Sequence, residues 1–295
     1  MNINSFLVSF CNNKLNDGRQ GLIGRVNYNS DNQALTYTPI DLLLPKELKP
    51  KGVTGLCKHN GQYVALLQNK VPHLLFFNSA FELINKWPLE HMKGVHSILS
   101  KNNEIYFAVT GHDNIQKTAD GVNFDVVWET GKKQDTIHLN SICNHQGKIY
   151  FTAFGEKSDQ SLWSSAKSGV ACAVDTDKPL KQNIWHPHSL FSHHGELYFC
   201  HSSLQKIESC KYVIAQDLPG YSRGLYVSDE LVVCGTSKGR LTSHSTGVQI
   251  SNISDKGVMA GTCGIWVYDR LNKNKHFLNL DQYATEVFDV IKLNT

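Results

Sequence analysis

The chain repeats one hairpin pattern five times, and this repeat constrains its fold more than any other feature. Each copy is a short apolar strand, a polar turn that usually carries Gly, and a second apolar strand. The turns supply Gly or Asn, which tolerate positive φ, and the flanking runs are rich in β-branched and aromatic residues. The pattern predicts antiparallel hairpins that begin at Val53, Val95, Leu139, Pro187 and Ser222.

Further short strands are predicted between the hairpins, at 72–77, 124–129 and 160–165. Four antiparallel strands per repeat are typical of a propeller blade. Equivalent residues of successive copies lie 42, 44, 48 and 35 positions apart, which suits blades.

The two ends of the chain complement each other. The N-terminal part offers strands at 6–10, 21–28 and 34–40 with no inner strand before them, and 286–291 reads as an inner strand without partners. Joining them leaves no exposed sheet edge, which is the usual hazard of an all-β fold. We expect a single-domain, all-β, six-bladed propeller over 1–295. A seventh blade from Gly257 to Leu280 is the less favoured alternative.

Six polar residues share one position near the starts of the predicted inner strands, and these strands surround a central channel. They are Thr54, His96, Asn140, His188, Arg223 and Glu286. The second strands return to the same face and add rim candidates: Asn12, Gln68, His112, His201, and Thr236 or Ser237. We expect His201 and His112 among the substrate contacts.

This ring suggests two kinds of chemistry. His96, His188 and Glu286 form a common metal set, which predicts a divalent ion such as Zn, Fe or Mn. The same residues could instead move protons without a metal, since His titrates near neutral pH. Asn140 and Thr54 would orient water or substrate. Arg223 would bind an anionic group or form an ion pair with Glu286.

Six of the other histidines among the 14 in the chain fall into two groups. His59, His145, His193 and His194 lie in hairpin turns, where a solvated role is the simplest interpretation. His138 and His186 each precede an inner strand by two residues, which places them at the mouth of the channel.

Composition narrows the partners. A net charge of +3 without basic blocks gives little support to a nucleic-acid or membrane footprint, so a small-molecule partner is expected. The sequence has no phosphate-binding loop of the GxxxxGK[ST] or GxGxxG type and no HExxH helix. Eight scattered cysteines without a CxxC pair, and an N-terminus without a basic signal region, favour reduced thiols and a cytoplasmic location.

Several motifs in the second half resemble a bacterial family of uncharacterised propeller proteins. The motifs are Pro187-His188-Ser189, Leu218 to Leu225 around Arg223-Gly224, Gly235 to Lys238, Gly264 to Asp269, and Glu286 to Val290. The resemblance covers mainly 185–292. It implies the propeller architecture and marks His188, Arg223 and Glu286 as motif residues, without naming a reaction.

More distantly, the ring is similar to the central sites of lactonase and gluconolactonase-type propellers, which bind calcium or another divalent ion. Here His and Arg replace the hard oxygen ligands, so calcium is less expected than a softer metal. We expect an enzyme acting on a small anionic or hydroxylated substrate, by metal-assisted hydrolysis or by acid-base lyase or isomerase chemistry. The alternative is a non-catalytic ligand-binding or protein-interaction propeller.

Overall fold

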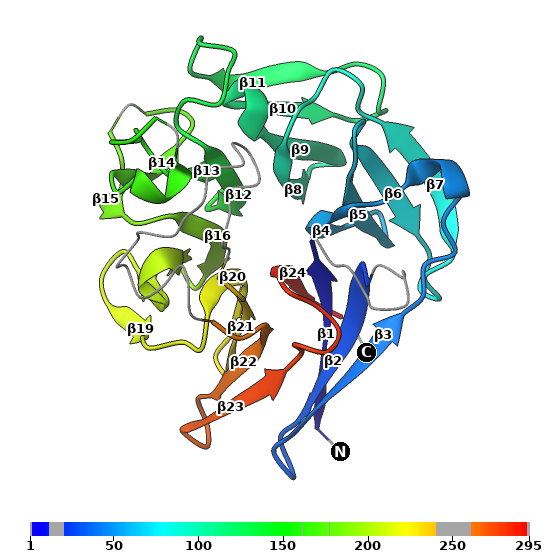
Figure 1. The fold of residues 1–295 in the computed structure, drawn as a ribbon, viewed down its shortest axis with the longest axis vertical. Coiled ribbons are helices and arrows are strands. Elements are labelled where there is room, and N and C mark those ends of the chain that lie inside the picture. The colour runs from blue at the N-terminus through cyan, green and yellow to red at the C-terminus, as the bar shows by residue number, and fades with distance from the viewer. Residues whose placement is uncertain (1, 12–20, 161, 177, 240–260, 294–295) are drawn as a thin grey trace.

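The protein is a six-bladed β-propeller, as the repeat predicts (Figure 1). The computed structural model describes residues 2–11, 21–160, 162–176, 178–239 and 261–293. Helical structure in these residues is limited to four single turns, η1 (Lys46–Leu48), η2 (Thr110–His112), η3 (Trp163–Ser165) and η4 (Ser202–Leu204). No described helix is long and apolar enough to cross a membrane.

Six four-stranded antiparallel sheets form the blades, numbered here from the N-terminus. Blade 1 contains β24 (Val287–Lys292), β1 (Ile3–Phe10), β2 (Ile23–Asn29) and β3 (Ala34–Ile40). Blade 2 contains β4 (Gly52–His59), β5 (Gln62–Gln68), β6 (His73–Phe77) and β7 (Leu83–Pro88). Blade 3 contains β8 (Val95–Lys101), β9 (Glu104–Val109), β10 (Asn114–Thr118) and β11 (Asp125–Glu129).

The second half of the ring repeats this arrangement. Blade 4 contains β12 (Leu139–His145), β13 (Lys148–Ala153), β14 (Gly169–Ala173) and β15 (Lys181–Ile184). Blade 5 contains β16 (Pro187–His193), β17 (Glu196–His201), β18 (Lys206–Ser209) and β19 (Val213–Ala215). Blade 6 contains β20 (Tyr221–Val227), β21 (Leu231–Ser237), β22 (Gly264–Asp269) and β23 (Asn274–Asn279).

The ring is closed by the C-terminal strand, as predicted. β24 pairs antiparallel with β1, with Val8 opposite Val290, and Figure 1 shows the red strand beside the dark blue one. The alternative of a seventh blade is wrong, because β22 pairs with β21 and β23 pairs with β22, which completes blade 6. The proposed start of that blade, at 257–260, lies outside the described residues.

One hydrophobic cluster fills each interface between neighbouring blades. At the closing interface, Phe6 and Val8 of blade 1 pack with Val233 and Ile265 of blade 6, all at most 2% exposed. Burying a large apolar side chain contributes about 1.5–3 kcal/mol. The blades are therefore held to one another by apolar packing, which leaves polar groups free to line the channel.

One predicted strand is wrong. In the segment 160–165, Trp163–Ser165 forms the turn η3, and Ser161 lies outside the described residues. Blade 4 takes its third strand from the later, more apolar β14. The predicted strands at 72–77 and 124–129 are present as β6 and β11.

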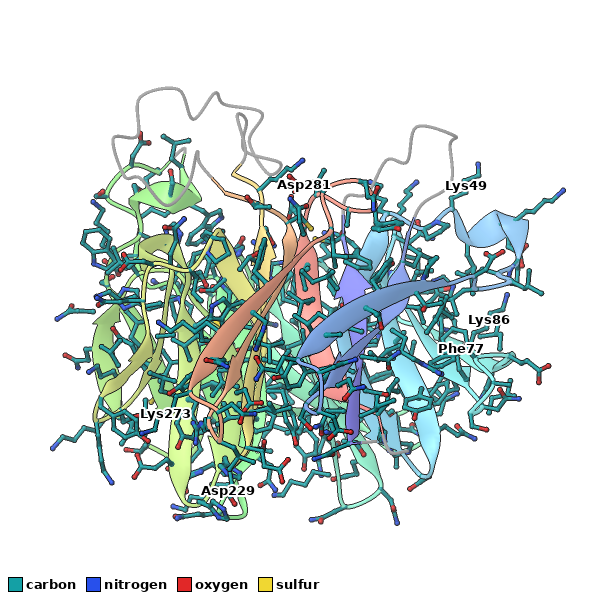
Figure 2. The ribbon with its side chains drawn as sticks, turned by 90° about the horizontal axis from the view of Figure 1, so that it is seen from below. Lys49, Phe77, Lys86, Asp229, Lys273 and Asp281 are labelled. Atoms are coloured by element: carbon teal, nitrogen blue, oxygen red, sulfur yellow. The ribbon has the colours of Figure 1, made fainter. Side chains whose placement is uncertain are left out.

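The ring has two faces, an entry face and an exit face. On the entry face the innermost strands begin, and on the exit face lie the hairpin turns that follow them. Figure 2 shows the two faces edge-on: Asp281, which shortly precedes β24, lies near one, and Asp229, in the turn after β20, lies near the other.

Candidate functional site

All six innermost strands carry a β-bulge or register irregularity at the same level of the channel. In blades 3, 4 and 1 the residue skipped by the pairing is His96, Asn140 and Phe288. In blade 2 the irregularity includes Thr54. In blades 5 and 6 it directly follows His188 and Arg223, respectively. A bulge re-aims side chains beside functional sites, so this level, called the bulge ring below, is where the channel departs from regular sheet.

The sixth member of the bulge ring is Phe288, two residues after the predicted Glu286. Hydrogen bonds between blades support this register. The hydroxyl of Ser141, directly after Asn140, accepts the N–H of Leu190 at 3.2 Å, and Asp289, directly after Phe288, likewise accepts the N–H of Leu56 at 2.9 Å. Glu286 lies before the strand and forms an isolated bridge with Ser237, closer to the entry face.

A cavity of about 450 Å³ occupies the channel from the bulge ring to the exit face. Three predicted site residues, His96, Asn140 and His188, line it together with Phe288. Its other end is lined by Ser100, Asn144, Ser192 and Lys292. Pockets of this size and mixed lining are typical of small-molecule sites.

His188 is held in one tautomer by its surroundings. Its Nδ1 lies 3.1 Å from the backbone oxygen of His186 and 2.9 Å from Oγ of Ser202, which itself donates to the backbone oxygen of Ser222 at 2.6 Å. A carbonyl oxygen only accepts, so the ring proton is on Nδ1 and Nε2 keeps its lone pair. Burial and the nearby Arg223 charge hold the pKa of His188 well below its usual range. The imidazole is therefore neutral and has an acceptor nitrogen.

His96 has the opposite arrangement. Its Nδ1 lies 3.5 Å from Nδ2 of Asn140, an amide donor, so in this geometry Nδ1 accepts and the ring proton is on Nε2. Asn140 is 2% exposed. The cavity is thus lined by one imidazole with a free lone pair and one with a donor N–H, a complementary pair for proton transfer.

Arg223 and Glu286 form an ion pair on the entry side of the bulge ring. Nη1 of Arg223 lies 3.1 Å from Oε2 of Glu286, and both side chains are largely buried. The Sγ of Cys11 lies 3.4 Å from the same oxygen. The guanidinium also faces the rings of Tyr221 and Phe288, at 5.0 and 5.3 Å, while its buried Nε has no hydrogen-bond partner. The predicted ion-pair alternative for Arg223 is present, and one donor remains unused.

Aromatic and imidazole rings surround the mouth of the channel, on the side of the ion pair. His138 lies 5.0 Å from His96 and 4.6 Å from Phe154, and Phe154 stacks on His186 at 4.6 Å. Burial, with the charge of His138, lowers the pKa of His186 to about 3. His138 and His186 thus lie at the channel mouth, as their position before the strands predicts. Both have positive φ, 53° in each case, where a non-Gly residue is strained.

Three other predicted contacts do not line the cavity. The hydroxyl of Thr54 donates to the backbone oxygen of Val95 at 2.9 Å and ties blade 2 to blade 3. Nε2 of His201 accepts the N–H of Trp185 at 2.7 Å, and its Nδ1 lies 3.5 Å from Glu208. His112 lies in η2, after β9, and does not line the cavity.

The rim candidates from the second strands also lie elsewhere. Thr236 donates its hydroxyl to the backbone oxygen of Thr262 at 2.7 Å, and Ser237 donates to that of Val287 at 3.1 Å. Oε1 of Gln68 is buried and has no hydrogen-bond partner. Asn12 lies outside the described residues.

The structure does not bring His96, His188 and Glu286 together as a metal ligand set. Among the described residues, a single group of three His, Cys, Asp or Glu side chains has its ligand atoms within 4.8 Å of one another. That group is His193, His194 and Asp229. The expected channel metal therefore does not fit the donor arrangement at the bulge ring.

Sequence reasoning missed three contributors to this site. Phe288 was hidden by the register error, although its place in the Glu286 to Val290 motif is a signal for it. Ser202 orients His188 from η4, and Cys11 contacts Glu286 from the far end of the chain. All eight cysteines are present as thiols, not disulfides.

Comparisons with known proteins agree with this architecture. A family model described as "Domain of unknown function (DUF4915)" matches residues 90–295. This match contains the motifs between 185 and 292 and also the hairpins of blades 3 and 4. A search among curated proteins finds no match.

Solved structures match over nearly the whole chain at low identity. A nidogen/laminin complex gives a TM-score of 0.63 at 11% identity, covering 98% of this chain and 97% of the other. A protein of unknown function from Bacteroides caccae gives 0.56 at 11%, covering 100% of both chains. A putative 6-phosphogluconolactonase from Bacteroides uniformis ATCC 8492 gives 0.52 at 13%, covering 99% and 100%. At such identities these likenesses show the fold alone.

Proposed function

The chain belongs to the family described as "Domain of unknown function (DUF4915)", and from its own residues we propose that its central channel binds a small hydroxylated or anionic metabolite and catalyses proton transfer on it. The reaction class is that of a lyase, an isomerase or a hydrolase that works by acid-base chemistry. The observation that carries the proposal is the convergence of His96, Asn140 and His188 on one cavity of about 450 Å³.

The two imidazoles have complementary roles in this proposal. His188, neutral and with its Nε2 lone pair available, would accept a proton from a substrate hydroxyl, a C–H group or water. His96, with its proton on Nε2, would donate one, while the Asn140 amide holds the His96 ring in place. Ser202 and the carbonyl of His186 fix the tautomer of His188, as hydrogen bonds to a catalytic imidazole do in general.

The ion pair supplies the charge at the mouth. Arg223 lies on the entry side of the bulge ring, outside the cavity lining, and its buried donor Nε has no partner. A ligand carboxylate or phosphate that extends past the ring would satisfy this donor. Glu286 keeps the guanidinium in place in the absence of ligand. Metal-assisted hydrolysis would require the ligand atoms of three residues to draw together, so we propose the metal-free route.

The likeness to a putative 6-phosphogluconolactonase fits a hydroxylated, anionic substrate class. We therefore propose sugar acids, their lactones and their phosphates as the first compounds to screen. The binding assay is a thermal shift followed by calorimetry on the full chain, and turnover is then measured with each compound that binds.

The variants H188N and R223Q test the site, with H145A as the matched control. His145 lies in a hairpin turn on the exit face and bonds to Ser192. We expect R223Q to weaken binding of anionic compounds about tenfold or more, and H188N to abolish turnover with a smaller effect on binding. Binding without turnover, unchanged in H188N, would favour the non-catalytic ligand-binding alternative. Equal loss in H145A, whose partner Ser192 lines only the far end of the cavity, would show that the effect is not specific to His188 or Arg223.

A further inference from the structure

We propose that His193, His194 and Asp229 form a binding site for one divalent transition-metal ion on the exit face. The site is independent of the channel chemistry, since none of the three residues lines the cavity. Figure 2 shows Asp229 at the opposite face from Asp281, which lies near the entry face.

The three side chains come from neighbouring blades. His193 ends β16 and His194 follows in the hairpin turn of blade 5, while Asp229 lies in the equivalent turn of blade 6. Nε2 of His193 and Nε2 of His194 are each 3.0 Å from Oδ1 of Asp229, and the two ring centroids are 4.1 Å apart. Two imidazole nitrogens and a carboxylate oxygen therefore already face one point.

This arrangement departs from the repeat in a specific way. In blades 2 and 4 the equivalent histidines use Nδ1 to bond a serine of the next blade: His59 to Ser100 at 3.0 Å and His145 to Ser192 at 2.8 Å. Blade 6 has Val227 at the position of those serines, which offers no hydroxyl. His193 instead turns its Nε2 to Asp229.

The second imidazole is also specific to this turn. The residue after His59 is Asn60 and the residue after His145 is Gln146, whereas His193 is followed by His194. Among the described blade junctions, a pair of histidines facing a carboxylate replaces the hydrogen-bonded structural histidine only between blades 5 and 6.

The donor set selects the class of metal. Neutral imidazole and carboxylate suit Zn²⁺, Ni²⁺ and Cu²⁺, whereas Ca²⁺ and Mg²⁺ prefer oxygen ligands alone. To bind the ion, each neutral ring carries its proton on Nδ1 and presents the Nε2 lone pair. The side chains of His194 and Asp229 are 69% and 73% exposed, so an ion reaches them without unfolding, and water completes the coordination.

The test is calorimetry with ZnCl₂ on the full chain, without a histidine tag. We expect one ion per chain, with affinity lowered about tenfold or more in H193A and in D229N, about 1.4 kcal/mol per tenfold step. The matched control is H145A, which removes the equivalent histidine of blade 4 and should leave the affinity unchanged. CaCl₂ should give no heat of binding at this site.

Several results would overturn the site. These are the absence of zinc binding by the wild-type chain, equal loss in H145A, or a loss in H188N with none in H193A. The last result would move the metal to the channel and would also contradict the metal-free route proposed for it, so the two proposals fail distinguishably. Unchanged circular dichroism of H193A and D229N ensures that a loss of affinity reflects lost ligands.

Discussion

At the residue scale, Asp289 is an unusual group because it is a partly buried carboxyl that lines the cavity beside the bulge ring. Its two oxygens accept the N–H groups of Leu56, at 2.9 Å, and of Val290, at 2.8 Å. Burial raises the pKa of Asp289 to about 6, although these two donors oppose the shift. The side chain therefore links blade 1 to blade 2 while it resists ionisation.

This pKa predicts an uncommon pH dependence of stability. The folded-state pKa exceeds the unfolded value, so the folded protein binds the proton more tightly. The stabilisation is present at low pH and is lost as the pH rises through about 6. Relative to D289N, the unfolding free energy of the wild type should fall by on the order of 2 kcal/mol between pH 4 and pH 7.

Urea unfolding of both proteins at several pH values measures this difference. Comparing the two proteins removes the contribution of His186, whose lowered pKa acts with the opposite sign in the same range. A difference between wild type and variant that stays constant over pH would contradict the prediction.

The sequence predicted which side chains lie at the site better than it predicted what those side chains contact. His188 and Arg223 were identified from their register and motifs, and both lie at the bulge ring. The tautomer of His188 depends on the hydroxyl of Ser202. The carboxylate of Glu286 is contacted by Cys11, which is 275 positions away in the sequence. Contacts of this kind are made by tertiary packing, and no local spacing encodes them.

At the element scale, the innermost strands depend on the bulges that interrupt them. Gly224 occupies the bulge of β20 with φ of 68°, in the left-handed region that favours glycine. A Cβ at this position would lie 2.8 Å from Val290 and 2.9 Å from the backbone of Asp289. Blade 6 therefore approaches blade 1 more closely than a side chain would allow.

We expect G224A to destabilise the protein more than a matched glycine substitution. G147A is the control, because Gly147 has φ of 83° and open space around its Cβ position. G147A should lower the free energy of unfolding by about 1 kcal/mol through backbone strain. G224A should lower it by about 2–4 kcal/mol, because strain and overpacking add. Equal losses of unfolding free energy in G224A and G147A, measured by chemical denaturation, would show that the close approach of blade 6 to blade 1 does not affect stability.

The same bulges explain the register error at the sixth inner strand. From the repeat alone, Glu286 is the natural polar counterpart of His188, and Phe288 reads as an apolar strand residue. A bulge changes the residue count on one strand without a mark in the sequence. The hairpins were predicted correctly because their alternation and turn residues are local signals, whereas 160–165 carried only a short apolar pattern.

At the scale of the whole molecule, closure of the ring depends on one short strand. β24 is the innermost strand of blade 1 and also borders blades 2 and 6. Its Val287 and Val290 belong to the core between blades 6 and 1, and Ile291 packs in the core between blades 1 and 2. Removing it exposes the edge of β1 and opens two cores together.

A chain ending at Glu286 should therefore fail to form a stable ring. We expect lost cooperativity in thermal unfolding and exposed apolar surface that binds a hydrophobic dye. A synthetic peptide with the sequence of 285–293 should restore the transition, and a scrambled peptide should not. A truncated chain as stable as the full one would contradict the role given to β24.

The overall architecture was the part most open to prediction, because a repeat copies the same local signals five times along the chain. The channel site was less predictable from the sequence, because its geometry depends on how six strands from separate blades meet.

The closure between β1 and β24 also sets an order of events during synthesis. β1 leaves the ribosome well before its inner partner, which begins at Val287. At ordinary translation rates this delay is on the order of tens of seconds. During that interval β1 has no partner for its inner edge, so this edge stays open to other strands until β24 is made.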